Sequence, residues 1–410
     1  MSCALCPDSK IRLTIIFEEC LATLSFENTR FRNILKEHKG SFAWLWTHSQ
    51  YKKWSTSPAS QLLYIEGKPG SGKSTLTRYF NDHLLELEPT ARSAIVAKFF
   101  YSDREGELQK SHRSMLQSIL YDILDQDEVF FYHRFQTEYR LLVAERERGH
   151  DDLTEWDYES LKTLLSSLSN HSPRKRLYLI IDAVDESDDG DRRDILNLLF
   201  DLCLNTNYCV VKAFIASRPV SQSKRSISKF HNIITLQDET KSDISRFASS
   251  FLKELEFTGF LDQAMEYIVE KAQGVFLWVQ LVKKELLAYD EAGLCTERDV
   301  FEFLKSLPTE LEEFYKRMLD KIGRKGAELE YGLKMLRFVL FACRPLMVSE
   351  LLHTLPIRDS SDVEFTASDE SFRKNVPPER LIIHCGGNFL EIKGHDGIAE
   401  SYKDTSSFID

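Results

Sequence analysis

Short apolar runs alternate with amphipathic stretches between residues 60 and 240 of the chain. Five of these runs are predicted to be buried strands, at residues 62–65, 95–100, 177–181, 209–216 and 233–236. Between them, apolar residues recur every three or four positions, which predicts helices at 116–124, 158–168 and 192–203. Strands that alternate with helices favour a parallel sheet with helices on both faces.

The pattern becomes helical on both sides of this region. Before it, apolar positions at helical spacing predict helix over residues 11–54. After it, an apolar stripe that starts at Ile244 opens a run of helices extending to about Leu355. Residues 359–370 are polar and acidic, which is typical of a mobile loop, and residues 399–410 have little to bury.

Composition narrows the class of protein. The 410 residues include 53 Lys and Arg against 64 Asp and Glu, a net charge of −11. A chain this acidic has no excess of cations to displace counterions, so we expect no nucleic-acid partner. No apolar run approaches the roughly 20 residues that span a bilayer. The eight scattered cysteines are typical of reduced thiols in a cytoplasmic protein, and Cys3 and Cys6 have no second pair to complete a zinc site.

A phosphate-binding loop is the strongest chemical signal. The pattern G-x-x-x-x-G-K-[ST] is matched in full, and a helical pattern begins at Thr75, directly after it. The matching residues are Gly67, Lys68, Pro69, Gly70, Ser71, Gly72, Lys73 and Ser74. Glycines allow backbone N–H groups to turn toward phosphate oxygens, and the helix presents its positive end to them. Lys73 would reach the β- and γ-phosphates, and the Ser74 hydroxyl would bind Mg²⁺.

Acidic residues follow the third predicted strand. A buried strand that ends in a carboxylate suits the Mg²⁺ side of such a site, so Asp182 is the candidate metal ligand. Asp185 and Glu186 come next, and either could polarise a water molecule against the γ-phosphate as a general base. Glu186 is the first choice for that role and Asp185 the alternative.

An arginine follows the fourth predicted strand. Arg218 comes directly after an apolar run, and the carboxyl ends of parallel strands form the ligand-binding edge of an open sheet. Its guanidinium is therefore a candidate contact for the γ-phosphate.

A guanine-reading pattern is considered and rejected. Residues 240–243 read Thr-Lys-Ser-Asp, but they do not directly end a strand, and no Asp-x-x-Gly switch starts at Asp182. Asp243 or Ser242 is expected instead to cap the helix that starts at Ile244. We therefore expect adenine nucleotides.

These motifs together resemble the NACHT class of STAND nucleotide-binding switches, in the fungal branch with a nephrocystin-like N-terminal P-loop module. The resemblance rests on three specific motifs, at residues 67–75, 182–186 and 217–219. The resemblance extends over roughly residues 20–390. Less specific family-like segments lie at 24–45, 51–54, 271–278, 344–351 and 385–387.

The resemblance implies a signalling switch that holds ADP when off, exchanges it for ATP, hydrolyses slowly with Mg²⁺ and forms a homo-oligomer when active. In fungi it implies a role in non-self recognition or cell death, with protein partners that the sequence leaves unknown. Members usually carry an N-terminal effector and C-terminal repeats. Neither is visible here, so we expect a switch core from a short or truncated gene product. It also implies a winged-helix His that holds ADP, but His395 follows no apolar strand, and no latch residue is assigned.

The predicted fold is a three-layer αβα P-loop NTPase core, followed by an all-α subdomain and a partial winged-helix domain. The parts are an N-terminal helical lead-in at 1–55, the NTPase domain at 56–237, a helical subdomain at 238–305 and a winged-helix-like domain at 306–410. Two alternatives stay open. The first is that the chain is another kind of P-loop ATPase, and the second is that it is a scaffold that binds nucleotide without catalysis.

Overall fold

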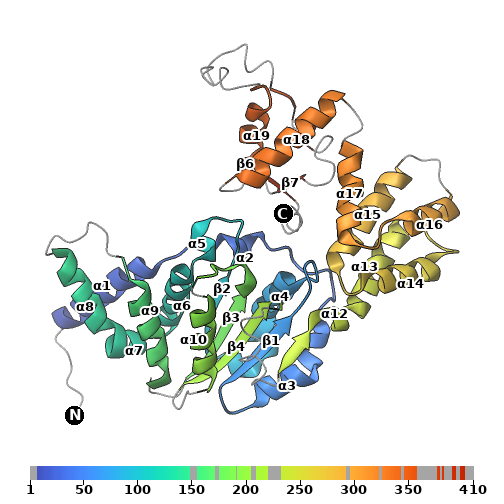
Figure 1. The fold of residues 1–410 in the computed structure, drawn as a ribbon. Coiled ribbons are helices and arrows are strands. Elements are labelled where there is room, and N and C mark those ends of the chain that lie inside the picture. Colours follow the sequence, from blue (N-terminus) through green and yellow to red (C-terminus); the bar gives the residue numbers. More distant parts are fainter. Residues whose placement is uncertain are drawn as a thin grey trace. The chain divides into compact units, whose positions relative to one another are not determined.

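The computed structural model describes most of the chain (Figure 1). The described residues are 7–147, 155–170, 175–190, 192–204, 209–219, 232–291, 296–322, 326–342, 346–357, 376–378, 381–382, 390–393 and 398–401. The chain forms two compact units, one of residues 1–247 with 273–275 and the other of residues 248–272 with 276–410. The four-part division expected from the sequence stays a prediction.

The first unit contains a five-stranded sheet in the order β2-β3-β4-β1-β5, in which all neighbouring strands are parallel. Its strands are β1 (Gln61–Glu66), β2 (Ile95–Phe100), β3 (Arg176–Asp182), β4 (Val210–Ser217) and β5 (Ile233–Thr235). All five overlap the apolar runs that predicted them. Because the strands are parallel, the loops that follow them meet at one edge of the sheet.

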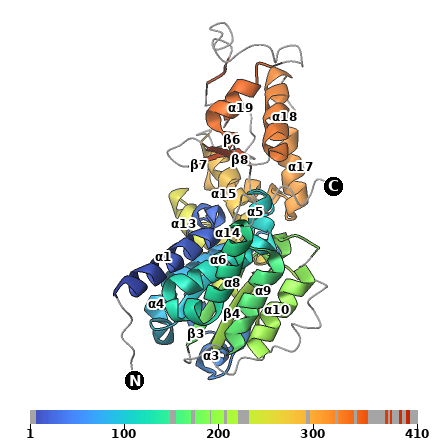
Figure 2. The same ribbon diagram turned by 90° about the vertical axis from the view of Figure 1, so that its left-hand side faces the viewer.

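Helices cover both faces of this sheet, which confirms the predicted αβα layers (Figure 1). On one face α6 (His112–Gln126) and α10 (Arg192–Leu204) pack against the strands, and α1 (Pro7–Leu24) and α9 (Tyr158–Ser166) pack against α6 (Figure 2). On the opposite face lie α3 (Ser49–Thr56) and α4 (Lys73–Leu87). There Phe80 of α4 stacks on Phe214 with ring centroids 4.3 Å apart, and Trp54 of α3 contacts Tyr178.

Shorter elements complete the first unit. They are α2 (Thr29–Asn33), α5 (Glu107–Lys110), α7 (Glu128–Phe130), α8 (Gln136–Glu147), α12 (Leu236–Glu239), the 3-10 turns at Ala43–Thr47, Pro89–Ala91, Ser167–Asn170 and Val184–Glu186, and a π-helical turn at Phe131–Phe135.

The lead-in is helical, as the sequence predicts, but in several pieces. Helices α1 and α2, a 3-10 turn and α3 occupy residues 11–54. The chain turns at Gly40 and Phe42, whose φ values of 82° and 64° lie in the left-handed region that ends a right-handed helix. Periodicity missed this break because Phe42 is itself an apolar core residue, 2% exposed.

The second unit is mainly helical. Its elements are α14 (Leu261–Ala272), α15 (Phe276–Asp290), α16 (Glu297–Ser306), α17 (Leu311–Ile322), α18 (Gly326–Phe341), β6 (Leu346–Met347), α19 (Val348–Thr354), β7 (Leu390–Lys393) and β8 (Ile398–Ser401), while α13 (Lys241–Glu254) spans the boundary between the units. The three strands form an antiparallel sheet in the order β6-β8-β7. No described helix is long and apolar enough to cross a membrane.

That small sheet corrects two expectations. Residues 346–347 lie in a strand, within a stretch expected to be helical. Strand β7 also leads toward His395, so the argument that no strand precedes this residue was wrong. His395 itself, the acidic segment 359–370, and Cys3 and Cys6 lie outside the described residues.

Candidate functional site

The phosphate-binding loop connects β1 to α4, as the sequence predicts. Gly72 stands directly before α4 with φ at 92°, a conformation that favours glycine. A Cβ on Gly67 would lie 2.6 Å from the Ser71 Oγ, so a larger residue here would displace the Ser71 hydroxyl. The Ser71 hydroxyl is buried without a hydrogen-bond partner among the described residues. The loop therefore holds a tight turn before a helix N-terminus, with polar groups that a phosphate would satisfy.

Lys73 lies across this loop. Its Nζ donates hydrogen bonds to the Gly67 oxygen at 2.9 Å and to the Lys68 oxygen at 3.1 Å. The Lys68 amide in turn donates to Gln237 Oε1 at 3.3 Å. The ammonium group is thus held over the turn whose amides would receive a phosphate, which is the position that phosphate binding requires.

Asp182 ends β3 and is fully buried. Its Oδ1 accepts a hydrogen bond from the Thr77 hydroxyl at 3.0 Å, whereas Oδ2 is buried with no hydrogen-bond partner among the described residues. Burial raises the pKa of Asp182, and the hydroxyls of Ser74 and Thr77 and the charges of Arg30 and Lys73 oppose that rise. A divalent cation would compensate the buried carboxylate oxygen.

The donor set suits magnesium. No group of three or more His, Cys, Asp or Glu side chains in the described part of the chain could hold a metal by itself. Mg²⁺ is usually held by one or two carboxylates together with substrate phosphates and water, rather than by a cage of protein ligands. Asp182 with the Ser74 hydroxyl matches that requirement.

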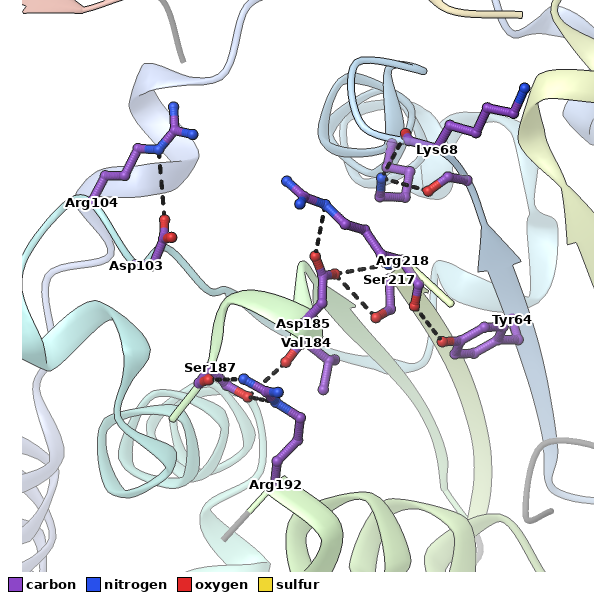
Figure 3. A network of polar contacts seen from close by, with 12 residues as sticks. Tyr64, Lys68, Asp103, Arg104, Val184, Asp185, Ser187, Arg192, Ser217 and Arg218 are labelled. Carbon is purple, nitrogen blue, oxygen red and sulfur yellow. Dashed lines mark hydrogen bonds and ion pairs between the residues drawn. The ribbon is translucent and has the colours of Figure 1, made fainter. Parts of the chain in front are cut away.

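Asp185 contacts the residues at the end of β4 through both of its carboxylate oxygens (Figure 3). Its Oδ1 accepts hydrogen bonds from the Ser217 hydroxyl at 3.1 Å and the Arg218 amide at 2.8 Å, and its Oδ2 lies 3.2 Å from the Arg218 Nε. Both oxygens therefore already face donors at the end of β4, which leaves Glu186 as the first candidate to accept a proton from water.

Glu186 follows a strained turn. Ala183 has a φ of 53°, uncommon for a residue with a Cβ, and its oxygen accepts a hydrogen bond from the Glu186 amide at 2.8 Å. Burial raises the pKa of the Glu186 carboxyl to about 7, with Asp103 and Asp185 also raising it and Arg30 and Arg104 lowering it. A carboxylate that titrates near neutral pH is suited to general-base chemistry.

Sequence reasoning missed three of these contributions. Thr77 lies one helical turn after Lys73, so its position at the buried carboxylate could have been read from the helix period. Arg30 and the left-handed Ala183 gave no signal, because a charged residue in a lead-in helix and an alanine after a strand are both ordinary. Their roles depend on long-range packing.

The predicted cap at Asp243 or Ser242 is wrong, because both residues lie inside the helix. Helix α13 begins earlier, at Lys241, and Asp243 lies in its first turn. The carboxylate Oδ2 instead accepts hydrogen bonds from the Phe42 amide and from the Trp44 indole, both at 3.0 Å. Asp243 thus anchors the lead-in turn to α13.

Comparisons with known proteins agree with the resemblance seen in the sequence. Residues 40–218 match the family described as Nephrocystin 3, N-terminal, and this range contains the P-loop, Asp182 and Arg218. The chain is also 23% identical over 373 residues to vegetative incompatibility protein HET-E-1 of Podospora anserina. That match covers 87% of this chain and 25% of the relative, so the chain spans about a quarter of the length of this curated protein.

Several solved structures are distantly similar. The structure of Drosophila ORC bound to DNA is 10% identical, with 96% of this chain and 90% of that chain covered and a TM-score of 0.40. The Pyrococcus horikoshii STAND protein with a tetratricopeptide repeat sensor is 12% identical, with coverage of 85% and 40% and a TM-score of 0.37. Similarities this distant assign no ligand or residue role to the present chain.

Proposed function

We propose that this chain, a NACHT-type STAND NTPase with a nephrocystin-like N-terminal module, is a signalling switch that binds ATP or ADP with Mg²⁺ and hydrolyses ATP slowly. The observation that carries the proposal is the meeting of the phosphate-binding loop with a buried carboxylate. Asp182 presents an unsatisfied oxygen beside the helix that carries Lys73 and Ser74. A magnesium–nucleotide complex supplies the missing positive charge and the missing phosphate together.

Each site residue has a distinct proposed role. The loop from Gly67 to Thr75 holds the phosphates through its amides and the Lys73 ammonium, and Ser74 with Asp182 holds the metal. Glu186, with its pKa raised to about 7, accepts the proton of the attacking water. Arg218 contacts the γ-phosphate, and its ion pair with Asp185 orients the guanidinium for that contact.

The biological setting is proposed from the relative. Similarity to a vegetative incompatibility protein supports a role in fungal non-self recognition or cell-death signalling. We propose in addition a homo-oligomer as the active form, from the resemblance of the motifs, and a cytoplasmic location, from the cysteine usage. The net charge of −11 supports the absence of a nucleic-acid partner.

Titration calorimetry of wild-type protein, Lys73→Ala and Lys53→Ala with ATP and Mg²⁺ tests the proposed site. Lys73→Ala removes a cation facing two phosphates, so we expect affinity to fall by about a hundredfold or more. Lys53 is an exposed lysine of α3, and its replacement should leave the affinity unchanged. Equal affinities for all three proteins, with unchanged melting temperatures, would refute the assigned site.

A further inference from the structure

A short segment of the lead-in packs against the strand ends that carry the site. The Phe31 ring of α2 lies 5.1 Å from the Phe100 ring, measured between centroids, and Phe26 lies 5.7 Å from Phe99. Phe100 is the register neighbour of Asp182 in the sheet. Residues 26–31 therefore pack at the carboxyl end of β2, the strand next to the one that ends in the proposed metal ligand.

Arg30 lies within this segment and is almost entirely buried, with 8% of its surface exposed. Its Nη1 is 3.6 Å from the Glu105 Oε1, and the Glu105 side chain is itself only 8% exposed. The Thr29 hydroxyl donates a hydrogen bond to the other Glu105 oxygen at 3.0 Å, which orients that carboxylate toward Arg30. The neighbouring Arg32 differs sharply, because its side chain is 72% exposed and pairs with Glu27 at the surface.

The Arg30 charge acts on both acids of the site. It lowers the pKa of Asp182 and of Glu186, and its effect on Asp182 exceeds that of Lys73. A buried guanidinium at this place therefore belongs to the charge balance of the site as well as to the ion pair with Glu105.

We propose that Arg30 is a nucleotide-discriminating residue, whose buried guanidinium lies on the γ-phosphate side of the site and favours nucleoside triphosphates over diphosphates. This inference rests on the proposed function. The P-loop amides hold the inner phosphates and Lys73 reaches the β- and γ-phosphates, whereas the metal ligand and the water-activating carboxylate flank the transferred phosphoryl group. Arg30 precedes the residue that packs on the register neighbour of Asp182, so its charge lies toward the end of the site where ATP carries a charge that ADP lacks. Glu105 is the positioning residue that holds Arg30 there.

The alternative is that the Arg30–Glu105 pair only attaches the lead-in to the loop after β2. The two roles differ in one measurable ratio. A purely structural residue affects the binding of both nucleotides alike, whereas a γ-phosphate contact changes the ratio of the two dissociation constants.

The test measures Kd for ADP and for a non-hydrolysable ATP analogue, both with Mg²⁺, by titration calorimetry. Arg30→Met keeps the length of the side chain and removes its charge, Arg30→Lys keeps the charge, and Arg32→Met is the exposed control on the same helix. We expect Arg30→Met to weaken binding of the analogue by about tenfold or more, the contribution of one charge-assisted hydrogen bond. We expect ADP binding to change by less than about threefold. Arg30→Lys should lie between Arg30→Met and wild type, and Arg32→Met should match wild type.

An unchanged ratio of the two Kd values in Arg30→Met, with nucleotide binding retained, would overturn the proposal. If Arg30→Met does not fold, as judged by thermal melting, the same ratio measured for Arg30→Lys decides the question, because the lysine loses the planar guanidinium fork. Failure of wild-type protein to bind either nucleotide would instead refute the proposed function itself.

Discussion

The pH dependence of ATP hydrolysis offers a sharp test of the chemistry assigned to Glu186. Its carboxyl follows the turn at Ala183, and burial raises its pKa to about 7. A general base works only when deprotonated, so the rate should rise as the pH passes upward through this value. The dependence should appear in kcat/KM, which reports groups of the free enzyme.

The magnitude follows from the titration curve. A group with a pKa of about 7 is roughly 10% ionised at pH 6 and roughly 90% ionised at pH 8. We therefore expect kcat/KM to increase about ninefold between these two pH values and to level off above them. An unperturbed glutamate, with a pKa of about 4.3, would give a flat profile over the same range.

Steady-state phosphate release, measured from pH 5.5 to 9, gives this profile. Glu186→Gln is the essential comparison, because phosphate groups of the nucleotide also titrate near pH 6 and the glutamine variant retains only that contribution. We expect it to bind ATP normally and to hydrolyse it at least about a hundredfold more slowly. Asp185→Asn, whose oxygens face Ser217 and Arg218, should keep a pH dependence centred near the same value. If Glu186→Gln hydrolyses at the wild-type rate and Asp185→Asn does not, the base is Asp185.

Two further outcomes are expected. Asp182→Asn should weaken ATP binding by about tenfold or more in the presence of Mg²⁺ and change it little in EDTA, because the lost carboxylate acts through the metal; equal losses in calorimetry under both conditions would contradict this role. Burial raises the pKa of three cysteine thiols to about 12, so at pH 8 a thiol-specific disulfide reagent should label them only after denaturant is added. The three cysteines are Cys20, Cys203 and Cys209. Rapid labelling of any of them in the native protein would contradict their burial.

The core of the fold was predictable because local pattern and tertiary structure agree there. Each strand of the parallel sheet coincides with a mainly apolar run, and in the loop from Gly67 to Ser74 the positive φ values of Gly70 and Gly72 favour the glycines that make the motif recognisable. Strand β4 shows the limit of this reasoning, because Lys212 lies in its interior and is fully buried. Its ammonium donates hydrogen bonds to the backbone oxygens of Trp54, Ser57 and Ala59 at 2.6–3.0 Å, and burial lowers its pKa to about 8.

The parts that sequence could not predict depend on residues distant along the chain. Asp243 contacts Phe42 across 201 positions, and no local pattern distinguishes that anchor from a helix cap. The ion pair between Asp185 and Arg218 likewise joins the ends of two neighbouring strands. Arg30 is buried because the lead-in packs against the end of β2, so its burial depends on the folded unit.

Identification of the nucleotide that the purified protein retains tests the central claim most directly. Gentle denaturation of the wild-type protein should release ADP or ATP in near-stoichiometric amount. Mass spectrometry of the released material should identify that nucleotide and find no guanine nucleotide above background. Lys73→Ala, purified in parallel, should release none. Recovery of no nucleotide from a folded wild-type protein that also fails to bind added ATP with Mg²⁺ would contradict the account of this chain as a nucleotide switch.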